Sequence, residues 1–357
     1  MLNSLYEKAI TKKGLHFDIE VDSNNDVEKQ LKGRWFDRSI KKSSDEFSIA
    51  AGDGSFNKKK FITANFCAIG AESVVHKDCL IKTEDSDLFK IGNVSFLDEL
   101  LSNYMAIFEL KCALRSIKKY NVDYYMFDGS VLGDLQNAFP KGAKLPSKIR
   151  DNLDELIIPE FESRLKIKPH GLVFPDIRDD FKLVESKKSD EIGHIEQINL
   201  HLASIEKILL LKELLDYRKK IVSISKSSSS NSLFKWNIPD IAVLDRFTKM
   251  QGMTRLEEEV ISKHANFQCY NDFFKSLKFT VFYVRLEDYQ NVFKVELPYD
   301  SSRQNVFRLI EKLKKYSVKG YPYLLNMAHN DVVIKDKNIK ELLKIAKIYE
   351  TTNREML

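Results

Sequence analysis

Two carboxylates in this chain stand in the same local sequence, Asp-Gly-Ser. Asp53 follows the small apolar run F-S-I-A-A-G at 47–52, and Asp128 follows the aromatic-rich run V-D-Y-Y-M-F at 122–127. An apolar, β-prone run that stops at a glycine is typical of a buried strand, and open α/β sheets place their chemistry at the carboxyl ends of such strands. Two acids delivered in this way suggest a shared cation. The alternative is that Asp-Gly-Ser serves only as turn chemistry, which is common.

Glu109 is a third carboxylate, and its sequence surroundings are unusual. The residues three and four positions away on either side are Met105, Ala106, Cys112 and Ala113, all of them apolar. An unpaired carboxylate is costly to bury, so a buried Glu109 needs a cation, an arginine or a raised pKa. The sequence leaves three explanations open: a metal-linked role, a structural ion pair, or simple exposure.

Three other residues are candidates on weaker grounds. His329 follows the apolar stretch Y-P-Y-L-L-N-M-A, where a histidine is either a core residue or a ligand. Lys226 leaves the strand-like run K-K-I-V-S-I-S and enters a serine tract, where it meets either a phosphate or solvent. Asp245 follows I-A-V-L and is interpreted as a third acid after an apolar run, although Arg246 and the lack of a glycine weaken the analogy.

Composition narrows the class of protein. With 357 residues and 43% hydrophobic side chains, the chain is long and apolar enough for a substantial core. It has no run of eighteen apolar residues, and its first residues lack a signal-peptide pattern, so we expect a cytoplasmic protein. The four cysteines are scattered without a C-x-x-C pair, and they indicate neither a cysteine zinc site nor a disulfide framework.

Positive charge is concentrated near the end of the chain. Between 303 and 347 there are eleven Lys or Arg against four acids, a local surplus larger than the net charge of +5 for the whole chain. Such a segment is typical of a polyanion partner, and Lys312 and Lys315 are the candidate contacts. The alternative is a solvated helix face.

The hydrophobic patterns predict the elements that position these residues. They indicate a three-stranded antiparallel meander with strands at 47–52, 60–70 and 74–83 and a turn at 54–57, then a helix at 92–120 and a strand ending at Asp128. A proline-rich, irregular and charged segment follows at about 140–185, and we expect it to form a helical insertion packed on the core. The remaining predictions are a helix at 191–218, a strand at 219–225, a hairpin of strands 279–286 and 291–297, a helix begun by Ser301 or Ser302, and a closing helix at 339–349.

This succession is that of the ribonuclease-H-like fold, an α/β mixed sheet flanked by helices. In that fold the first and fourth strands lie side by side, which brings Asp53 and Asp128 together. Carboxylates that close repel each other unless cations neutralise them, and oxygen ligands suit Mn²⁺ or Mg²⁺. A pair of such ions about 4 Å apart can activate water and stabilise the leaving oxygen of a phosphodiester.

Four pieces of sequence in this order carry a resemblance. A-G-D-G-S (51–55), F-D-G-S-V-L (127–132), V-S-I-S-K (222–226) and Y-P-Y-L-L-N-M-A-H-N-D (321–331) resemble the NurA family of archaeal DNA-end-processing nucleases. The resemblance implies a Mn²⁺-dependent (or Mg²⁺-dependent) 5′ to 3′ nuclease on single- and double-stranded DNA, a homodimer, and work with a HerA-type hexameric translocase at double-strand breaks. It implies metal binding by Asp53, Glu109, Asp128 and His329, and it makes Tyr321 a candidate active-site residue.

We therefore expect an N-terminal extension at 1–45, a nuclease domain at 46–335 with its insertion, and a C-terminal helix at 336–357. Two other functions stay open. An actin-like ATPase would share the core and the Asp-Gly-Ser turns, but the late Gly-rich adenosine loop is missing: only Gly252 and Gly320 occur from 252 onward. A non-catalytic DNA-binding assembly subunit would have a degenerate site, whereas all four candidate ligands are present.

Overall fold

The computed structural model describes residues 3–12, 26–140, 144–184, 194–263 and 265–348. The strands in these segments are β1 Trp35–Asp37, β2 Ile49–Lys60, β3 Ala64–His76, β4 Leu80–Gly92, β5 Tyr124–Asp128, β6 Ile221–Ser225, β7 Gly252–Thr254, β8 Glu257–Val260, β9 Lys278–Arg285, β10 Phe293–Leu297, β11 Ser317–Val318 and β12 Tyr321–Pro322. The helices are α1 Asn3–Thr11, α2 Asp26–Lys32, α3 Leu97–Tyr120, α4 Val131–Gln136, α5 Ser147–Asp151, α6 Ile158–Ile167, α7 Phe174–Asp180, α8 His194–Asp216, α9 Asp240–Phe247, α10 Asn271–Lys275, α11 Arg303–Lys315, α12 Tyr323–Val332 and α13 Asp336–Ile345, with a π-helix Leu153–Ile157 and a 3₁₀ helix Arg218–Lys220.

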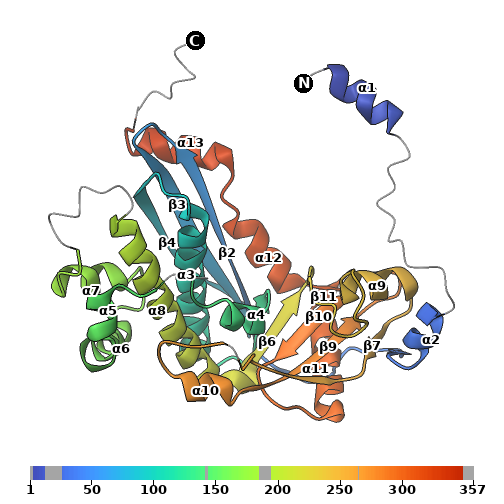
Figure 1. Ribbon diagram of the computed structural model, residues 1–357. Coiled ribbons are helices and arrows are strands. Elements are labelled where there is room, and N and C mark those ends of the chain that lie inside the picture. The colour runs from blue at the N-terminus through green and yellow to red at the C-terminus, as the bar shows by residue number, and fades with distance from the viewer. Residues whose placement is uncertain (1–2, 13–25, 141–143, 185–193, 264, 349–357) are drawn as a thin grey trace.

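A single large sheet organises the described segments. Its strands lie in the order β1-β7-β9-β10-β6-β5-β2-β3-β4, and β8 pairs with β9 (Figure 1). The predicted hairpin at 279–297 is confirmed as β9 and β10, which pair antiparallel. β1, which lies inside the predicted N-terminal extension, pairs with β7.

The predicted meander exists as β2, β3 and β4, but its strands are longer than expected. The predicted turn at 54–57 is wrong, because β3 pairs with β2 without interruption from Ile49 opposite His76 to Lys60 opposite Asn65. The predicted break after Gly70 is also wrong, since β4 pairs along the other side of the continuous β3. Asp53 therefore lies inside a strand of 12 residues and not at a strand end.

The strand that ends at Asp128 is placed as predicted. β5 lies parallel to β2, with Gly52 opposite Phe127, and β6 lies parallel to β5 on its other side. The chain leaves the sheet at Gly129, whose φ of 134° is a conformation that side-chain-bearing residues rarely adopt. The sheet is thus mixed and flanked by helices. The first and fourth strands of the core, β2 and β5, are adjacent, as the predicted ribonuclease-H-like fold requires.

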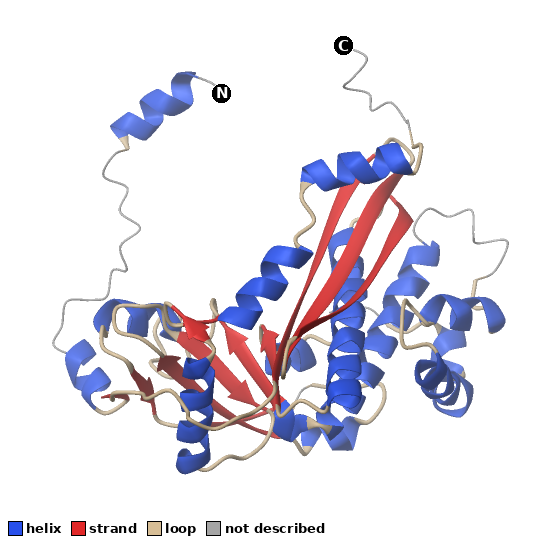
Figure 2. Cartoon of the chain, turned by 180° about the vertical axis from the view of Figure 1, so that it is seen from behind, coloured by secondary structure: helices blue, strands red, loops and turns tan. Residues whose placement is uncertain are grey.

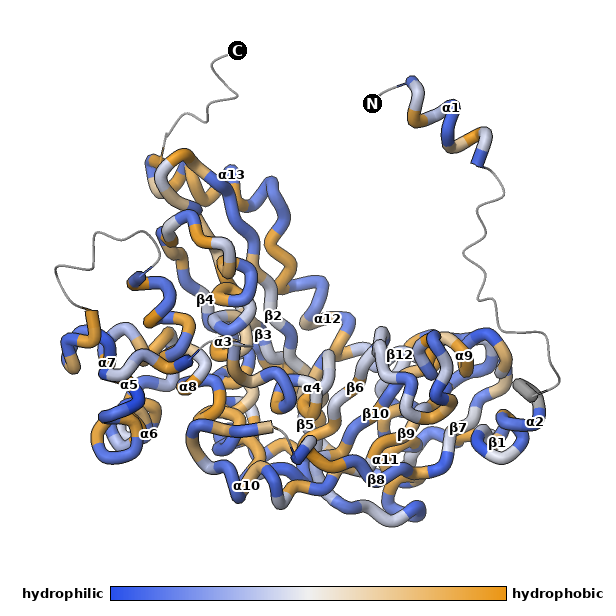
Figure 3. The backbone as a smooth tube through the Cα atoms, viewed as in Figure 1, coloured by the Kyte–Doolittle hydropathy of each residue, from blue (hydrophilic) through white to orange (hydrophobic). Residues whose placement is uncertain are grey.

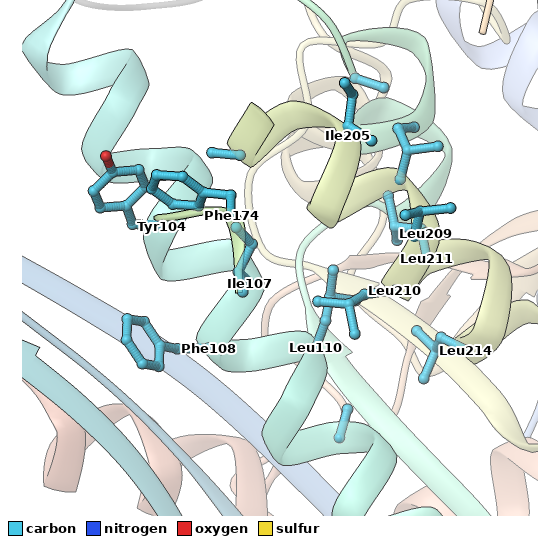
Figure 4. Close-up of a cluster of buried hydrophobic side chains, with 14 of the residues drawn as sticks. Tyr104, Ile107, Phe108, Leu110, Phe174, Ile205, Leu209, Leu210, Leu211 and Leu214 are labelled. Carbon is cyan, nitrogen blue, oxygen red and sulfur yellow. The ribbon is translucent and has the colours of Figure 1, made fainter. Parts of the chain in front are cut away.

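Helices α3 and α8 cover one face of the sheet. Figure 4 shows Ile107 and Leu110 of α3 beside the leucines of α8, and the ring of Tyr104 lies 5.1 Å from that of Phe174. α8 is apolar on most sides, which is typical of a helix buried all round. The predicted helices at 92–120 and 191–218 are confirmed with shorter bounds; residues 191–193 lie outside the described residues.

The predicted helical insertion is confirmed, because α5, the π-helix Leu153–Ile157, α6 and α7 all lie within it. Phe161 and Phe174 are fully buried in the same core as α3 and α8. The start of α7 is held by Glu206 of α8, whose carboxylate accepts from the backbone N–H of Phe174 at 2.8 Å and pairs with Lys111 at 3.0 Å. These contacts fix the insertion to the outer side of the helical layer. Residues 141–143 and 185 lie outside the described residues.

The opposite face of the sheet is covered by α11 and α12 (Figure 2). Ser302 is the N-cap of α11, its hydroxyl accepting from the N–H of Asn305, so one of the two predicted caps is confirmed. The closing helix begins at Asp336, three residues before the predicted start, and residue 349 lies outside the described residues. Figure 3 shows hydrophobic residues gathered along the central strands. Among the described helices, none combines the length and apolar character needed to cross a membrane.

Candidate metal centre

Three side chains from three elements converge at the centre of the sheet. Asp53 of β2, Asp128 of β5 and His329 of α12 each offer a ligand atom, and these atoms lie within 4.8 Å of one another. Nδ1 of His329 is 2.7 Å from Oδ2 of Asp53. We call these residues the metal triad. The sequence-based expectation that residues far apart in the chain meet here is met for these three.

The strand geometry explains why Asp53 faces α12. Side chains alternate across a strand, and Ile49 and Ala51 belong to the core between the sheet and α12, so Asp53 points the same way. Burial raises the pKa of Asp53, and the contact with His329 and a hydrogen bond from the N–H of Gly54 at 2.9 Å partly offset this effect. The charged form of this partly buried carboxylate is unfavourable without a positive partner, so a bound cation would stabilise it.

Glu109 approaches the metal triad from the other face of the sheet. Its carboxylate lies against Gly54, where a Cβ atom would overlap Oε1 of Glu109. Burial, followed by the charges of Asp53, Asp134 and Asp128, raises the pKa of Glu109 to about 8. Glu109 and Asp128 line the same cavity of about 30 Å³. Simple exposure is therefore wrong for Glu109, although its oxygens are not within the 4.8 Å group formed by the metal triad.

Lys226 and Tyr321 surround Asp128. Nζ of Lys226 is 2.9 Å from Oδ2 of Asp128, and the Tyr321 hydroxyl donates to the same oxygen at 3.4 Å. The Lys226 ammonium also lies 4.4 Å from the centre of the Tyr321 ring. Burial and the charge of Asp128 raise the pKa of Tyr321, so its hydroxyl stays protonated and available as a donor. Both predicted residues are thus brought to the site.

Three other predicted residues lie elsewhere. Lys312 and Lys315 are on α11 and contact the ring of Phe47, and Lys312 also contacts Tyr124 at the opposite end of β5 from Asp128. The interpretation of Asp245 as an acid at a strand end is wrong, because this residue lies in helix α9 and pairs with Arg285 at 3.2 Å. The apolar run I-A-V-L belongs to this short helix, in which Ile241, Val243 and Leu244 are buried.

The sequence reasoning missed a buried pair beside the turn after Asp128. Glu296 of β10 has no exposed surface and accepts from the hydroxyl of Ser130, and Lys294 pairs with it at 3.0 Å. Two opposite charges two positions apart in an apolar strand share one face of the sheet. That spacing is the available signal, but it predicts only that the two charges lie on one face of β10; their burial depends on contacts with distant segments. A third missed residue, Lys207, is buried and lines the cavity with Glu109.

The donor set of the metal triad fits a hard divalent cation. Two carboxylates and an imidazole suit Mn²⁺ well, and Mg²⁺ is also compatible because it accepts carboxylates and completes its coordination with water. Glu109 adds a third carboxylate, which lines a cavity together with Asp128. Bringing these acids together without a cation is unfavourable, since burial and mutual repulsion raise the pKa values of both Asp53 and Glu109.

Comparisons with known proteins agree with this architecture. A protein of Methanocaldococcus jannaschii named "Probable DNA double-strand break repair nuclease NurA" is 28% identical over 95% of this chain and 88% of its own. The crystal structure of the NurA nuclease from Sulfolobus solfataricus superposes with a TM-score of 0.72 at 21% identity, covering 97% of each chain. A crystal structure of NurA bound to dAMP and manganese superposes with a TM-score of 0.65 at 15% identity and full coverage of both chains. The NurA domain model matches residues 47–334, most of the chain and all of the residues just described, so this protein belongs to the NurA family.

Proposed function

We propose that this protein is a metal-dependent DNA nuclease that hydrolyses phosphodiester bonds with Mn²⁺ or Mg²⁺. The observation that carries the proposal is the convergence of Asp53, Asp128 and His329 within 4.8 Å in a chain of the NurA family. The relative bound to dAMP and manganese supports both the kind of cation and the kind of substrate. Family membership favours this function over an actin-like ATPase or a non-catalytic assembly subunit.

The residues of the site have separable roles in this proposal. Asp53, Asp128 and His329 hold the cation, and Glu109 adds negative charge from the other face of the sheet. When bound, the cation supplies water activation and stabilisation of the leaving oxygen. His329 is half exposed, so its imidazole can also exchange a proton with solvent.

Lys226 and Tyr321 face the substrate side of Asp128. A cation held by Asp128 would compete with the Lys226 ammonium for that carboxylate, which would leave the ammonium free to bind a phosphate oxygen. The Tyr321 hydroxyl, kept protonated by its raised pKa, can donate to the same phosphate. Lys312 and Lys315 contact phosphates further along the strand. DNA binding should therefore weaken as salt rises.

The finer properties of the enzyme follow from family resemblance. We propose 5′ to 3′ polarity, exonuclease and single-strand endonuclease activity, a homodimer, a HerA-type hexameric translocase as partner in end resection and homologous recombination, and a cytoplasmic location. The name of the archaeal relative, which refers to double-strand break repair, supports this setting. We also keep the division into an N-terminal extension, a nuclease domain and a C-terminal helix as a proposal.

The test uses DNA labelled at the 5′ or the 3′ end, incubated with the full chain and Mn²⁺, Mg²⁺ or EDTA. We expect cleavage with Mn²⁺ and none with EDTA, and the two labels report polarity. Asp53→Ala should abolish cleavage while leaving DNA binding in EDTA near the wild-type level. Asp98→Ala is the matched control, since Asp98 is an exposed acid whose partner is Lys58. Normal turnover in Asp53→Ala would contradict the proposal.

A further inference from the structure

A series of arginines alternates with phenylalanines at the β1 end of the sheet. The guanidinium of Arg255 lies 5.7 Å from the ring centre of Phe36, and that of Arg303 lies 5.4 Å from the same ring. Arg303 is also 5.4 Å from the ring centre of Phe307, and Arg38 is 4.0 Å from it on another side. We call these five residues the arginine ladder.

Three separate parts of the chain build the arginine ladder. Phe36 and Arg38 belong to β1 and the residue after it, and Arg255 follows β7, the strand that pairs with β1. Arg303 and Phe307 are one turn apart on α11, so their side chains lie on one face of that helix. The positions of the alternating arginine and phenylalanine side chains are thus fixed by β1 and β7 at the edge of the sheet and by α11.

The charges of the arginine ladder are not used within the fold. All three arginines are exposed, and among the described residues none of their guanidinium groups has a carboxylate partner. By contrast, Arg115 and Arg164 each pair with an acid. Arginines held on aromatic faces lose little further side-chain freedom when they bind an anion, since the stacking already orders them. Such a preordered, unpaired set of positive charges is suited to binding a polyanion.

The position of the arginine ladder relates it to the metal triad. The core that α11 covers is the one that α12 covers, so both helices lie on the face of the sheet from which His329 reaches Asp53. Lys312, nine residues after Arg303 on α11, is about 14 Å along the helix axis and contacts Tyr124 at the start of β5. From Tyr124 to Asp128 the strand rises about 13 Å.

The path from Asp128 along β5 to Lys312 and then along α11 to Arg303 is therefore at most about 27 Å long, the length of about eight nucleotides at the 3.4 Å spacing of a duplex strand and of fewer nucleotides in an extended single strand. Phosphates pair with guanidinium groups, and unpaired bases stack on arginine planes and aromatic rings. We infer that the arginine ladder binds single-stranded DNA several nucleotides away from the scissile bond. The inference rests on the proposed function only for the identity of the polyanion.

The test measures binding of fluorescent oligothymidylates of 4 and 12 nucleotides to the full chain in EDTA, so that cleavage plays no part. The ladder variant is Arg38→Ala/Arg255→Ala/Arg303→Ala. The control is Arg150→Ala/Lys278→Ala/Lys337→Ala, which removes three charges from exposed side chains that each have an acidic partner. We expect the ladder variant to lose tenfold or more in affinity for the 12-mer, and its log K against log salt slope to fall by about 2, since each phosphate contact on a single strand contributes about 0.7.

The 12-mer is long enough to reach from the metal triad to the ladder and the 4-mer is not, so the 12-mer should bind the wild-type chain more tightly than the 4-mer, and the ladder variant should lose most of that difference. The pair Phe36→Leu/Phe307→Leu keeps the apolar volume and all charges, and it should weaken the 12-mer severalfold by removing the aromatic platform. If the ladder variant binds the 12-mer as tightly as the control variant does, the inference is overturned. That result is the one expected if this surface binds an acidic protein and not DNA. Absence of metal-dependent cleavage in the wild-type chain would refute the proposed nuclease while leaving this binding result intact.

Discussion

The hydroxyl of Ser130 lies 2.8 Å from both carboxylate oxygens of Glu296, a residue 166 positions away in the chain. Oε2 of Glu296 also accepts from the N–H of Leu132 at 3.3 Å, and Ser130 Oγ accepts from Gly133 N at 2.8 Å. The turn that follows Asp128 is therefore tied to β10 at several points. Because Asp128 is two residues from Ser130, this tie limits how far the chain at Asp128, a candidate metal ligand, can move.

Ser130→Ala should reduce both stability and metal affinity. Loss of an N-cap serine costs about 1 kcal/mol, and freeing the turn should weaken Mn²⁺ binding severalfold because Asp128 is then less ordered. Isothermal titration with Mn²⁺ and thermal unfolding measure the two effects. Ser302→Ala is the control, since Ser302 caps α11 in the same way but is remote from the metal triad. Equal Mn²⁺ affinity in both variants would limit Ser130 to a capping role.

Gly54→Ala should inactivate the enzyme without changing a single polar group. An added Cβ overlaps the Glu109 carboxylate and meets the Met105 side chain, so α3 or Glu109 must move. We expect a stability loss of about 1–3 kcal/mol, as in other overpacked sites, and a fall in turnover of tenfold or more. Gly33→Ala is the control, because a Cβ at Gly33 meets nothing within 4 Å. Turnover near the wild-type level in Gly54→Ala would show that the position of Glu109 is unimportant.

Stability of the metal-free protein should fall as the pH rises from about 5 to 8. Glu109 has a pKa of about 8 in the folded chain and an ordinary value of 4.5, so between these values the folded state holds a proton that the unfolded state has lost. Raising the pH then favours unfolding, with a slope of up to about 1.4 kcal/mol per pH unit from this group. Urea unfolding in EDTA at several pH values measures the slope. Glu109→Gln should flatten it; an unchanged slope would assign the effect to other groups.

Lys226→Met should separate metal binding from substrate binding. The ammonium competes with a cation for Asp128, so its removal should leave Mn²⁺ affinity equal to or higher than that of the wild type. The loss of a phosphate contact should raise KM for DNA several-fold. Lys220→Met is the control, since Lys220 donates to Asn121 and Val122 before β5 begins. Weaker Mn²⁺ binding in Lys226→Met would instead make Lys226 a positioning residue for Asp128.

The two Asp-Gly-Ser tripeptides show what the sequence could and could not predict. At Asp128 the strand ends as expected, because Gly129 adopts a positive φ and turns the chain. At Asp53 the same letters continue as strand, because β3 supplies hydrogen-bond partners along all of β2. The local sequence is equal in both places, and the difference lies in the neighbouring strand, which no local pattern contains. The two acids were still predicted to lie close together, and they do, because the parallel pairing of β2 with β5 depends on the order of elements.

Other parts of the site depend on contacts between distant residues. His329 follows an apolar stretch that reads equally well as core, and only the packing of α12 over β2 shows that its ring reaches Asp53. The burial of Glu296 depends on Ser130 and could not be found from either segment alone. The interpretation of Asp245 was wrong because a run of four apolar residues fits a buried helix segment and a strand equally well.

Side chains on opposite faces of a β-sheet are normally separated by the strand backbone and do not contact each other. At Gly54, which has no side chain, only the backbone separates the two faces. The carboxylate of Glu109, on α3, lies against one face, and the neighbouring Asp53 points to the other face and contacts His329 of α12. A displacement of α3, whose outer side packs on α8, would therefore change the electrostatic field around Asp53 and Asp128 while the strand itself stayed in place. The electrostatic environment of the metal triad thus depends on how the helices on the far side of the sheet are packed.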